Sequence, residues 1–184
     1  MRYILASASP RRKVLLKKLI RSFRVVPSRI DESAVKGKTP EALAVKAALA
    51  KALEVAGRYP RSTVIGADTI VVLGRRVLGK PRDKKDAGRM LRSLAGRTHR
   101  VITGLAVVAK RTGATFITTN VRMKRVSPRT IAQYVATGRP LDKAGAYGIQ
   151  EIEEIFIDRI DGDYDNVVGL PVQALKILLK ECQK

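Results

Sequence analysis

Short apolar runs alternate along the chain with segments whose apolar residues recur at helical spacing, as buried strands and amphipathic helices do. We expect strands at 3–6, 23–27, 63–73, 77–78, 101–109, 115–126 and 155–160, with hairpins around 74–76 and across 111–113. We expect helices after Ser9, Thr39, Asp83, Ser127 and Pro171. The first should bury Val14, Leu15 and Leu19, and the second should stop at Gly57. This alternation predicts an α/β protein with a mixed sheet.

The composition is that of an ordinary folded protein. The 184 residues are 45% hydrophobic and 29% charged, which predicts one domain over 1–184. No apolar run approaches the roughly 20 residues that span a bilayer. The first six residues lead straight to Arg11 and Arg12, so we expect no signal peptide. The single cysteine, Cys182, has no disulfide partner in the chain, and a cytoplasmic location is expected.

The formal net charge of +21 is the main argument for a nucleic-acid-binding protein. The basic residues are spread over the whole chain, however, and aromatic residues are only 4%, with no tryptophan. Stacking of single strands needs aromatic faces, so that binding mode has little support. The excess charge would also steer a triphosphate toward a site in a salt-sensitive way. A basic nucleic-acid-binding or cell-division regulatory protein stays open as an alternative.

The turn into the first helix predicts a phosphate site. Ser9 can accept a hydrogen bond from an early helical amide, and Pro10 suits the first helical position. Arg11 and Arg12 stand at the positive end of the helix dipole, where cations are disfavoured by about 0.3–1 kcal/mol each. Together with the Ser7 hydroxyl, these groups suit a polyanion. The alternative is a solvated basic first turn.

Three further positions carry candidate chemistry. Asp68 lies inside an apolar strand, where an unpaired carboxylate costs several kcal/mol, so it must meet a cation, a metal or water. It is a candidate metal ligand or general base, or else a carboxylate that merely ends a strand. Lys80, before a proline, would suit a phosphate near a metal, although such turns are common on surfaces. Glu32 could share Mg²⁺ with Asp68, or be an exposed loop acid.

We expect a glycine-rich loop over 139–150 that carries two candidate substrate ligands. Gly145 and Gly148 permit close backbone approach, and Lys143 offers a positive charge. Gln150 can both donate and accept hydrogen bonds, as reading a base edge requires.

Several other chemistries lack the residues that they need. His99 is the single histidine and lies inside a strand-like stretch, which argues against histidine clusters for zinc and against a complete Ser-His-Asp triad. The sequence contains no P-loop and no nucleophile elbow. The acidic stretch from Asp161 begins like a calcium loop, but Asn166 and Val172 stand where that loop needs glycine and glutamate.

Taken in order, these segments resemble the Maf family of nucleoside triphosphate pyrophosphatases over nearly the whole chain. The matching segments are 5–12, 31–32, 46–51, 66–69, 79–81, 96–99, 142–150 and 166–171. The resemblance implies a strongly twisted mixed sheet flanked by helices, similar to the inosine triphosphatase-like fold. It also implies hydrolysis of a nucleoside triphosphate between the α and β phosphorus atoms, dependence on Mg²⁺ or Mn²⁺, and a homodimer without a membrane or a specific nucleic-acid partner.

The resemblance also assigns roles to residues. Asp68 would be the catalytic base or the metal-linked activator of water. Lys80, the second catalytic residue, would complete the cationic clamp on the phosphates together with Lys51. Glu32 would support the metal. The substrate would be bound by Ser7, Ser9, Arg11, Arg12, Lys51, Lys143 and Gln150. The form of 142–150 resembles the subgroup that acts on dTTP and UTP, with 7-methyl-GTP or inosine-type nucleotides as the alternative.

Overall fold

The computed structural model describes residues 2–184, so that Met1, the first residue of the predicted domain, lies outside the described residues. A seven-stranded sheet contains β1 (Arg2–Leu5), β2 (Arg24–Val25), β3 (Ser62–Leu73), β4 (Arg76–Leu78), β5 (Thr98–Val108), β6 (Thr112–Met123) and β7 (Ile157–Asp161). Its order is β2-β1-β3-β5-β6-β7, with β4 paired to β3. Strand β1 is parallel to β2 and to β3, whereas the β3–β4 and β6–β7 pairs are antiparallel. The predicted α/β fold with a mixed sheet is thereby confirmed. Among residues 2–184, none of the helices combines the length and the apolar character that crossing a bilayer requires.

The chain divides into two compact units. Among the described residues, the first contains 2–69, 102–117 and 165–184, and the second contains 70–101 and 118–164. The single domain over 1–184 stays a prediction. Three strands contribute residues to both units, namely β3 (Ser62–Leu73), β5 (Thr98–Val108) and β6 (Thr112–Met123).

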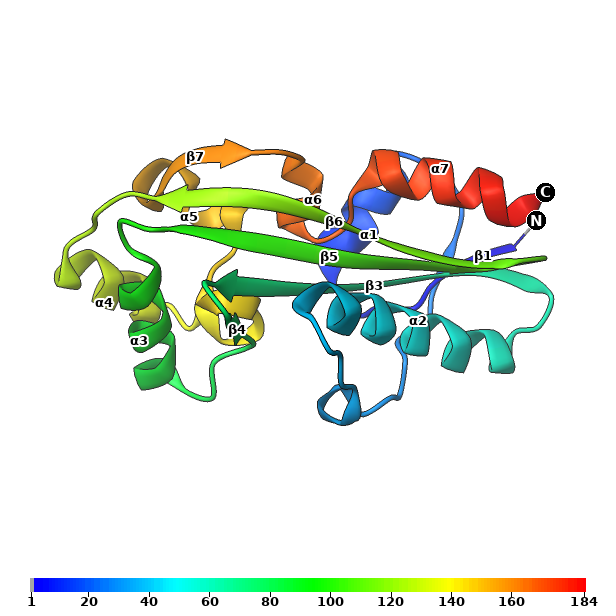
Figure 1. Cartoon of the computed structure of the whole chain (residues 1–184), viewed down its shortest axis with the longest axis horizontal. Coiled ribbons are helices and arrows are strands. Elements are labelled where there is room, and N and C mark those ends of the chain that lie inside the picture. The colour runs from blue at the N-terminus through cyan, green and yellow to red at the C-terminus, as the bar shows by residue number, and fades with distance from the viewer. Residues whose placement is uncertain (1) are drawn as a thin grey trace. The chain divides into compact units, whose positions relative to one another are not determined.

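The first unit begins with the predicted strand, turn and helix, which are β1 (Arg2–Leu5) and α1 (Pro10–Lys17) (Figure 1). The elements that follow are β2 (Arg24–Val25), the 3₁₀ turn η1 (Glu32–Ala34), α2 (Pro40–Arg58), α6 (Tyr164–Val168) and α7 (Val172–Gln183). The core under α2 contains Ile4, Ala6, Val26, Ala48, Ala52, Val55, Val64 and Ala106. Alanines on the buried face of α2 bring the helix close to the sheet, and this approach positions the site described below.

Some expectations for this unit were wrong. Val14 is 60% exposed, because the short helix α1 turns Leu15 and Leu16 toward the core instead. Strand β2 has two residues in place of five. Helix α2 continues through Gly57 to Arg58, since a single glycine costs a helix only about 1 kcal/mol. Helix α6 was not expected.

The second unit contains the predicted β3–β4 hairpin and the helices around it. Its further elements are β4 (Arg76–Leu78), α3 (Lys84–Leu94), α4 (Pro128–Ala136), the 3₁₀ turns η2 (Arg139–Asp142) and η3 (Ala144–Ala146), α5 (Ile149–Phe156) and β7 (Ile157–Asp161). Helix α3 packs against α4, η2 and η3.

One helix in this unit replaces a predicted loop and the start of a predicted strand. Helix α5 covers residues 149–156, so Gln150 stands in the first turn of a helix and β7 begins at Ile157. The physical reason is the spacing of Ile149, Ile152 and Phe156, which places all three on one buried face. The glycines before this helix had suggested a longer loop.

Candidate active site

Close packing of α2 against the sheet brings Lys51 to Asp68. A Cβ atom added to Gly66 on β3 would lie 2.2 Å from the carbonyl oxygen of Ala48, and one added to Gly104 on β5 would lie 2.2 Å from that of Ala44. No side chain fits there. Lys51 follows Ala48 by about one helical turn, and Asp68 follows Gly66 by two residues on the same face of β3. The glycines therefore decide that the two charged side chains meet.

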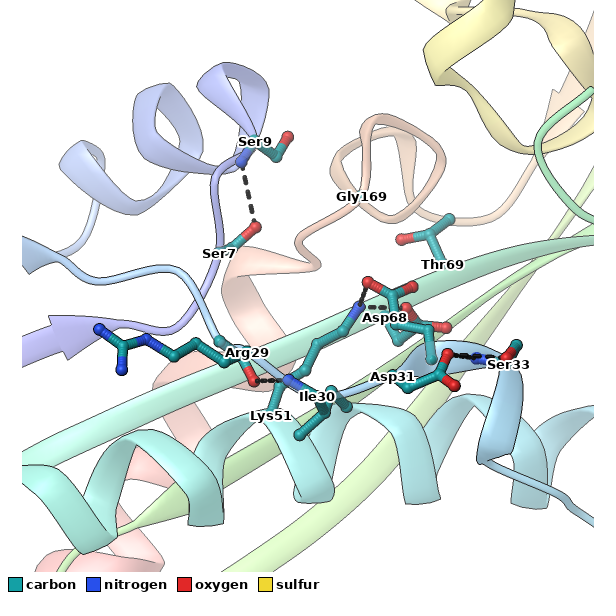
Figure 2. Close-up of polar contacts among 12 residues, drawn as sticks. Ser7, Ser9, Arg29, Ile30, Asp31, Ser33, Lys51, Asp68, Thr69 and Gly169 are labelled. Atoms are coloured by element: carbon teal, nitrogen blue, oxygen red, sulfur yellow. Dashed lines mark hydrogen bonds and ion pairs between the residues drawn. The ribbon is translucent and has the colours of Figure 1, made fainter.

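Lys51 is shared by two carboxylates. Its Nζ donates to Asp68 Oδ1 at 2.7 Å (Figure 2). The same nitrogen lies 2.9 Å from Glu32 Oε1. The Lys51 side chain is 8% exposed and that of Asp68 is 13% exposed, whereas that of Glu32 is 54% exposed. The requirement that the in-strand carboxylate meet a cation is thus satisfied by Lys51. The cluster is closed on the α2 side and open to water at Glu32.

Asp31 holds the short turn that presents Glu32. Its Oδ1 accepts hydrogen bonds from the Ser33 amide at 2.9 Å and from the Ser33 hydroxyl at 2.7 Å (Figure 2). These hydrogen bonds lower the pKa of Asp31 below its ordinary value. Asp31 therefore caps the turn, and the neighbouring carboxylate, that of Glu32, is the one that pairs with Lys51.

The first turn of α1 forms as predicted. Ser9 is the N-cap, its Oγ accepts from the Arg12 amide at 3.4 Å, and Pro10 follows at the first helical position. The buried Ser7 Oγ accepts from the Ser9 amide at 3.2 Å (Figure 2). Arg11 is half-buried. The structure therefore brings the predicted phosphate ligands together at one helix start.

Arg12 is held by three acceptors. Its Nε donates to the Gly169 carbonyl at 2.8 Å, one terminal nitrogen donates to Ser7 Oγ at 3.3 Å, and the other donates to Thr69 Oγ1 at 2.9 Å. Loss of hydration lowers the pKa of Arg12, while the nearby negative charges of Asp68 and Glu32 act in the opposite direction. The arginine of the helix start is thus electrostatically coupled to the acidic cluster, which consists of Glu32 and Asp68.

Consecutive residues of β3 serve these two clusters. Successive side chains of a strand point to opposite faces, so Asp68 reaches Lys51 of α2 while Thr69 reaches Arg12 of α1. Figure 2 places Thr69 near the turn at Gly169, and a Cβ atom on that glycine would lie 3.3 Å from Thr69 Oγ1. Sequence reasoning gave no role to Thr69 or Gly169. Only their positions in the sequence could have pointed to them. Thr69 directly follows Asp68, and Gly169 lies in the turn before the last helix.

The remaining predicted site residues belong to the second unit. Lys80 is exposed and makes no hydrogen bond or ion pair with the part of the chain that the structure describes. Gln150 is also exposed. Lys143 is 6% exposed, and its Nζ lies 2.7 Å from Asp142 Oδ1 and 3.1 Å from Glu151 Oε1. It also donates to the Arg139 carbonyl, so all three ammonium donors have internal acceptors. This geometry makes Lys143 a support of the loop, and its role toward substrate stays a prediction.

The acidic cluster offers oxygen donors to a divalent cation. Glu32 and Asp68 each place a carboxylate oxygen within 2.9 Å of one nitrogen. Within residues 2–184, no three acidic, histidine or cysteine side chains form a group that could hold a metal ion. Mg²⁺ commonly uses one or two carboxylates together with waters and substrate phosphates. The donor set therefore fits such an ion when a phosphorylated substrate supplies further oxygens.

The fold is similar to that of a solved structure, and the sequence matches a known family. The structure of a HAM1 protein from Coxiella burnetii matches with a TM-score of 0.57 and 16% identity, covering 98% of this chain and 99% of that one. This likeness confirms the expected class of fold. Residues 2–182 match the family described as Maf-like protein, and the chain belongs to that family.

Three relatives share about half of the sequence with this chain. A protein of Moorella thermoacetica is 50% identical over 96% of this chain and 92% of its own length. One from Gloeobacter violaceus is 47% identical over 98% of this chain and 96% of its own, and one from Thermococcus gammatolerans is 48% identical over 94% and 92%. Each of the three is named a dTTP/UTP pyrophosphatase.

Proposed function

We propose that this protein hydrolyses nucleoside triphosphates between the α and β phosphorus atoms, with dTTP and UTP as preferred substrates. The observation that carries the proposal is the pair of clusters on consecutive residues of β3, with Asp68 ion-paired to Lys51 and Thr69 bonded to Arg12. The charges of Asp68 and Glu32 act on Arg12, which supports a proposal in which Asp68 is the base and Arg12 holds phosphate at the same site. Family membership and the names of the relatives support the same reaction.

In the proposed reaction, the oxygen of a water molecule attacks the α phosphorus. The bond between the α phosphorus and the oxygen that bridges to the β phosphorus breaks. The water proton passes to the Asp68 carboxylate, which Lys51 holds in place, and pyrophosphate leaves with the bonding electrons. Arg12 and the α1 N-terminus neutralise phosphate charge. Lys51, which is ion-paired with Asp68, and Lys80 are assigned to the phosphates as further cations. Catalysis of this kind depends mainly on positioning and electrostatics.

We further propose that the reaction depends on Mg²⁺ or Mn²⁺ held by Glu32 and Asp68. A bound cation of this kind withdraws charge from phosphate oxygens and lowers the pKa of a coordinated water. Gln150 is assigned to base recognition, because its exposed amide can pair with the alternating acceptors and donor of a thymine or uracil edge. A cytoplasmic location and a homodimer belong to the same proposal. The molar mass in solution, measured by light scattering, tests the homodimer.

The decisive experiment measures pyrophosphate release from dTTP, UTP, CTP, ITP, 7-methyl-GTP and the standard purine nucleotides, first with Mg²⁺ and then with EDTA. Metal-dependent release that favours dTTP and UTP is expected. Preference for 7-methyl-GTP or ITP would keep the reaction and discard the pyrimidine assignment. No release by the folded protein, together with salt-dependent duplex binding, would replace the proposal with nucleic-acid binding.

A further inference from the structure

A chain of hydroxyl groups runs from Arg12 into the interior of the first unit. Arg12 donates to Thr69 Oγ1, and Thr69 Oγ1 lies 2.9 Å from Thr103 Oγ1 on the neighbouring strand β5. Thr103 Oγ1 in turn donates to the Asn166 carbonyl at 3.0 Å. Thr103 is fully buried, at 0% exposure, and the two partners of its hydroxyl are Thr69 Oγ1 and the Asn166 carbonyl. Its hydroxyl therefore acts only through Thr69.

The direction of each hydrogen bond follows from the end of the chain. A carbonyl oxygen only accepts, so the single hydroxyl hydrogen of Thr103 points to Asn166. The Thr103 hydroxyl oxygen must then accept a hydrogen bond from the Thr69 hydroxyl. The single hydroxyl hydrogen of Thr69 is therefore donated to Thr103. Thr69 is left with lone pairs only, one of which receives Arg12. A buried carbonyl thus fixes Thr69 as an acceptor.

The network closes on itself through residues 166–169. Thr103 is bonded to the Asn166 carbonyl, and Arg12 Nε is bonded to the Gly169 carbonyl three residues later. Gly169 has φ of +120°, and a Cβ atom there would lie 3.5 Å from Arg12 Nε. Only glycine readily accepts that backbone conformation. One rigid turn therefore holds both ends of the Arg12–Thr69–Thr103 chain.

We infer that Thr103 is a positioning residue for the phosphate site, acting through Thr69 to hold the guanidinium of Arg12. Three of the five N–H groups of Arg12 are used by Gly169, Ser7 and Thr69. One hydrogen on each terminal nitrogen remains to meet phosphate oxygens in a fixed orientation. This inference rests on the proposed function for the identity of the ligand.

The test replaces Thr103 by valine, which keeps the branched shape and suits a strand while removing the hydroxyl. The matched control is Thr119→Val. Thr119 is also 0% exposed, lies on β6, and donates to a backbone carbonyl, that of Asp163, at 3.0 Å. Thr103→Ser restores the hydroxyl, and Thr69→Val breaks the same chain from its exposed side without leaving the Asn166 carbonyl unpaired.

Steady-state hydrolysis of dTTP with Mg²⁺ gives the first readout. Thr103→Val and Thr69→Val are each expected to raise KM about tenfold with kcat changed less than about twofold, as loss of a ground-state phosphate contact does. The double variant should be no worse than either single one. Thr103→Ser and Thr119→Val should stay within about twofold of the unchanged protein. Equal effects at Thr103 and Thr119, or no effect at Thr103, would overturn the inference.

Calorimetric binding of inorganic tripolyphosphate without metal gives a readout that does not depend on turnover. Weaker binding in Thr103→Val and Thr69→Val than in Thr119→Val supports the positioning role, even if the unchanged protein hydrolyses no nucleotide and the proposed function fails. Turnover by the unchanged protein with equal tripolyphosphate affinity in Thr103→Val and Thr119→Val overturns the positioning role and leaves the proposed function standing. Absence of both turnover and tripolyphosphate binding removes both.

Discussion

Lys51 Nζ of α2 lies 2.7 Å from Asp68 Oδ1 of β3, and both side chains are largely withdrawn from water. An ion pair in such surroundings is costly to break, because the remaining partner is left as an uncompensated charge. The pair therefore links the fold of the first unit to the chemistry proposed for it.

Replacing Asp68 by asparagine removes the proposed base and keeps the size of the side chain. We expect kcat to fall by at least about a hundredfold, the usual scale of a general base. The fold should persist, because Lys51 keeps Glu32 as a partner. Pyrophosphate release measures the effect. Asp158→Asn, an exposed carboxylate paired with Arg122, serves as the control. Activity near that of the unchanged protein in Asp68→Asn would exclude the base role.

Replacing Lys51 by methionine tests the ion pair as a source of stability. The free energy of unfolding should fall by about 3 kcal/mol, since Asp68 loses its buried cation. Adding Asp68→Asn should recover part of that loss. Urea unfolding of the two single variants and the double variant gives the coupling energy, expected at about 1–3 kcal/mol. Strictly additive losses would mean that Lys51 and Asp68 do not interact in solution.

Replacing Gly66 by alanine should separate α2 from β3. The added methyl group would meet the Ala48 carbonyl oxygen at 2.2 Å, so the helix must shift and carry Lys51 with it. We expect a loss of about 2 kcal/mol in unfolding free energy, together with lower kcat/KM. The matched substitution is Gly57→Ala at the end of the same helix, where nothing lies within 4 Å.

Gly57→Ala should be neutral or stabilise the protein by up to about 1 kcal/mol, because alanine favours a helix. Denaturation curves of the two alanine variants provide the comparison. If Gly66→Ala were as stable and as active as Gly57→Ala, the close helix–strand contact would not position the site.

His99 provides a pH test that its uniqueness makes unambiguous. The ring is 2% exposed and its Nε2 lies 2.6 Å from the Tyr147 hydroxyl. Burial lowers the pKa of His99 from 6.5 to about 4. Proton NMR should therefore show one histidine resonance that moves near pH 4 in the folded protein and near pH 6.5 in concentrated urea.

The sign of the stability change follows from that shift. The unfolded chain takes up the histidine proton first, so stability is complete above pH 6.5 and falls as the pH drops toward 4. The loss from this group is about 3 kcal/mol. His99→Gln should show a smaller decrease across the same interval in urea unfolding. An equal decrease would assign the effect to other groups.

Gln150→Ala tests base recognition. We expect the ratio of kcat/KM for dTTP over CTP to fall about tenfold, the scale of one hydrogen bond lost to a mismatched base edge. Glu154→Ala, an exposed change on the same helix, should leave the ratio unchanged. Unchanged ratios in both variants would remove Gln150 from base recognition while leaving hydrolysis itself untouched.

Local signals determined the helix starts. Ser9, Thr39, Asp83 and Ser127 each cap a helix where the sequence predicts one, because a cap needs only a side chain and the amides of the next turn. The hairpin around 74–76 follows in the same way from adjacent residues. Helix α5 was missed because its buried face overlaps a glycine-rich stretch and a β-branched run, and local preference does not decide between them.

The sequence alone determined which residue types are out of place, and so pointed to Asp68 in an apolar strand and to arginines at a helix start. Only the tertiary structure decided their partners. Lys51, 17 residues before Asp68, meets it because glycine and alanine let two backbones approach. Thr103 lies 34 residues beyond Thr69 and is bonded to it because neighbouring strands place them in contact. Such contacts depend on packing between distant segments, which no local pattern encodes.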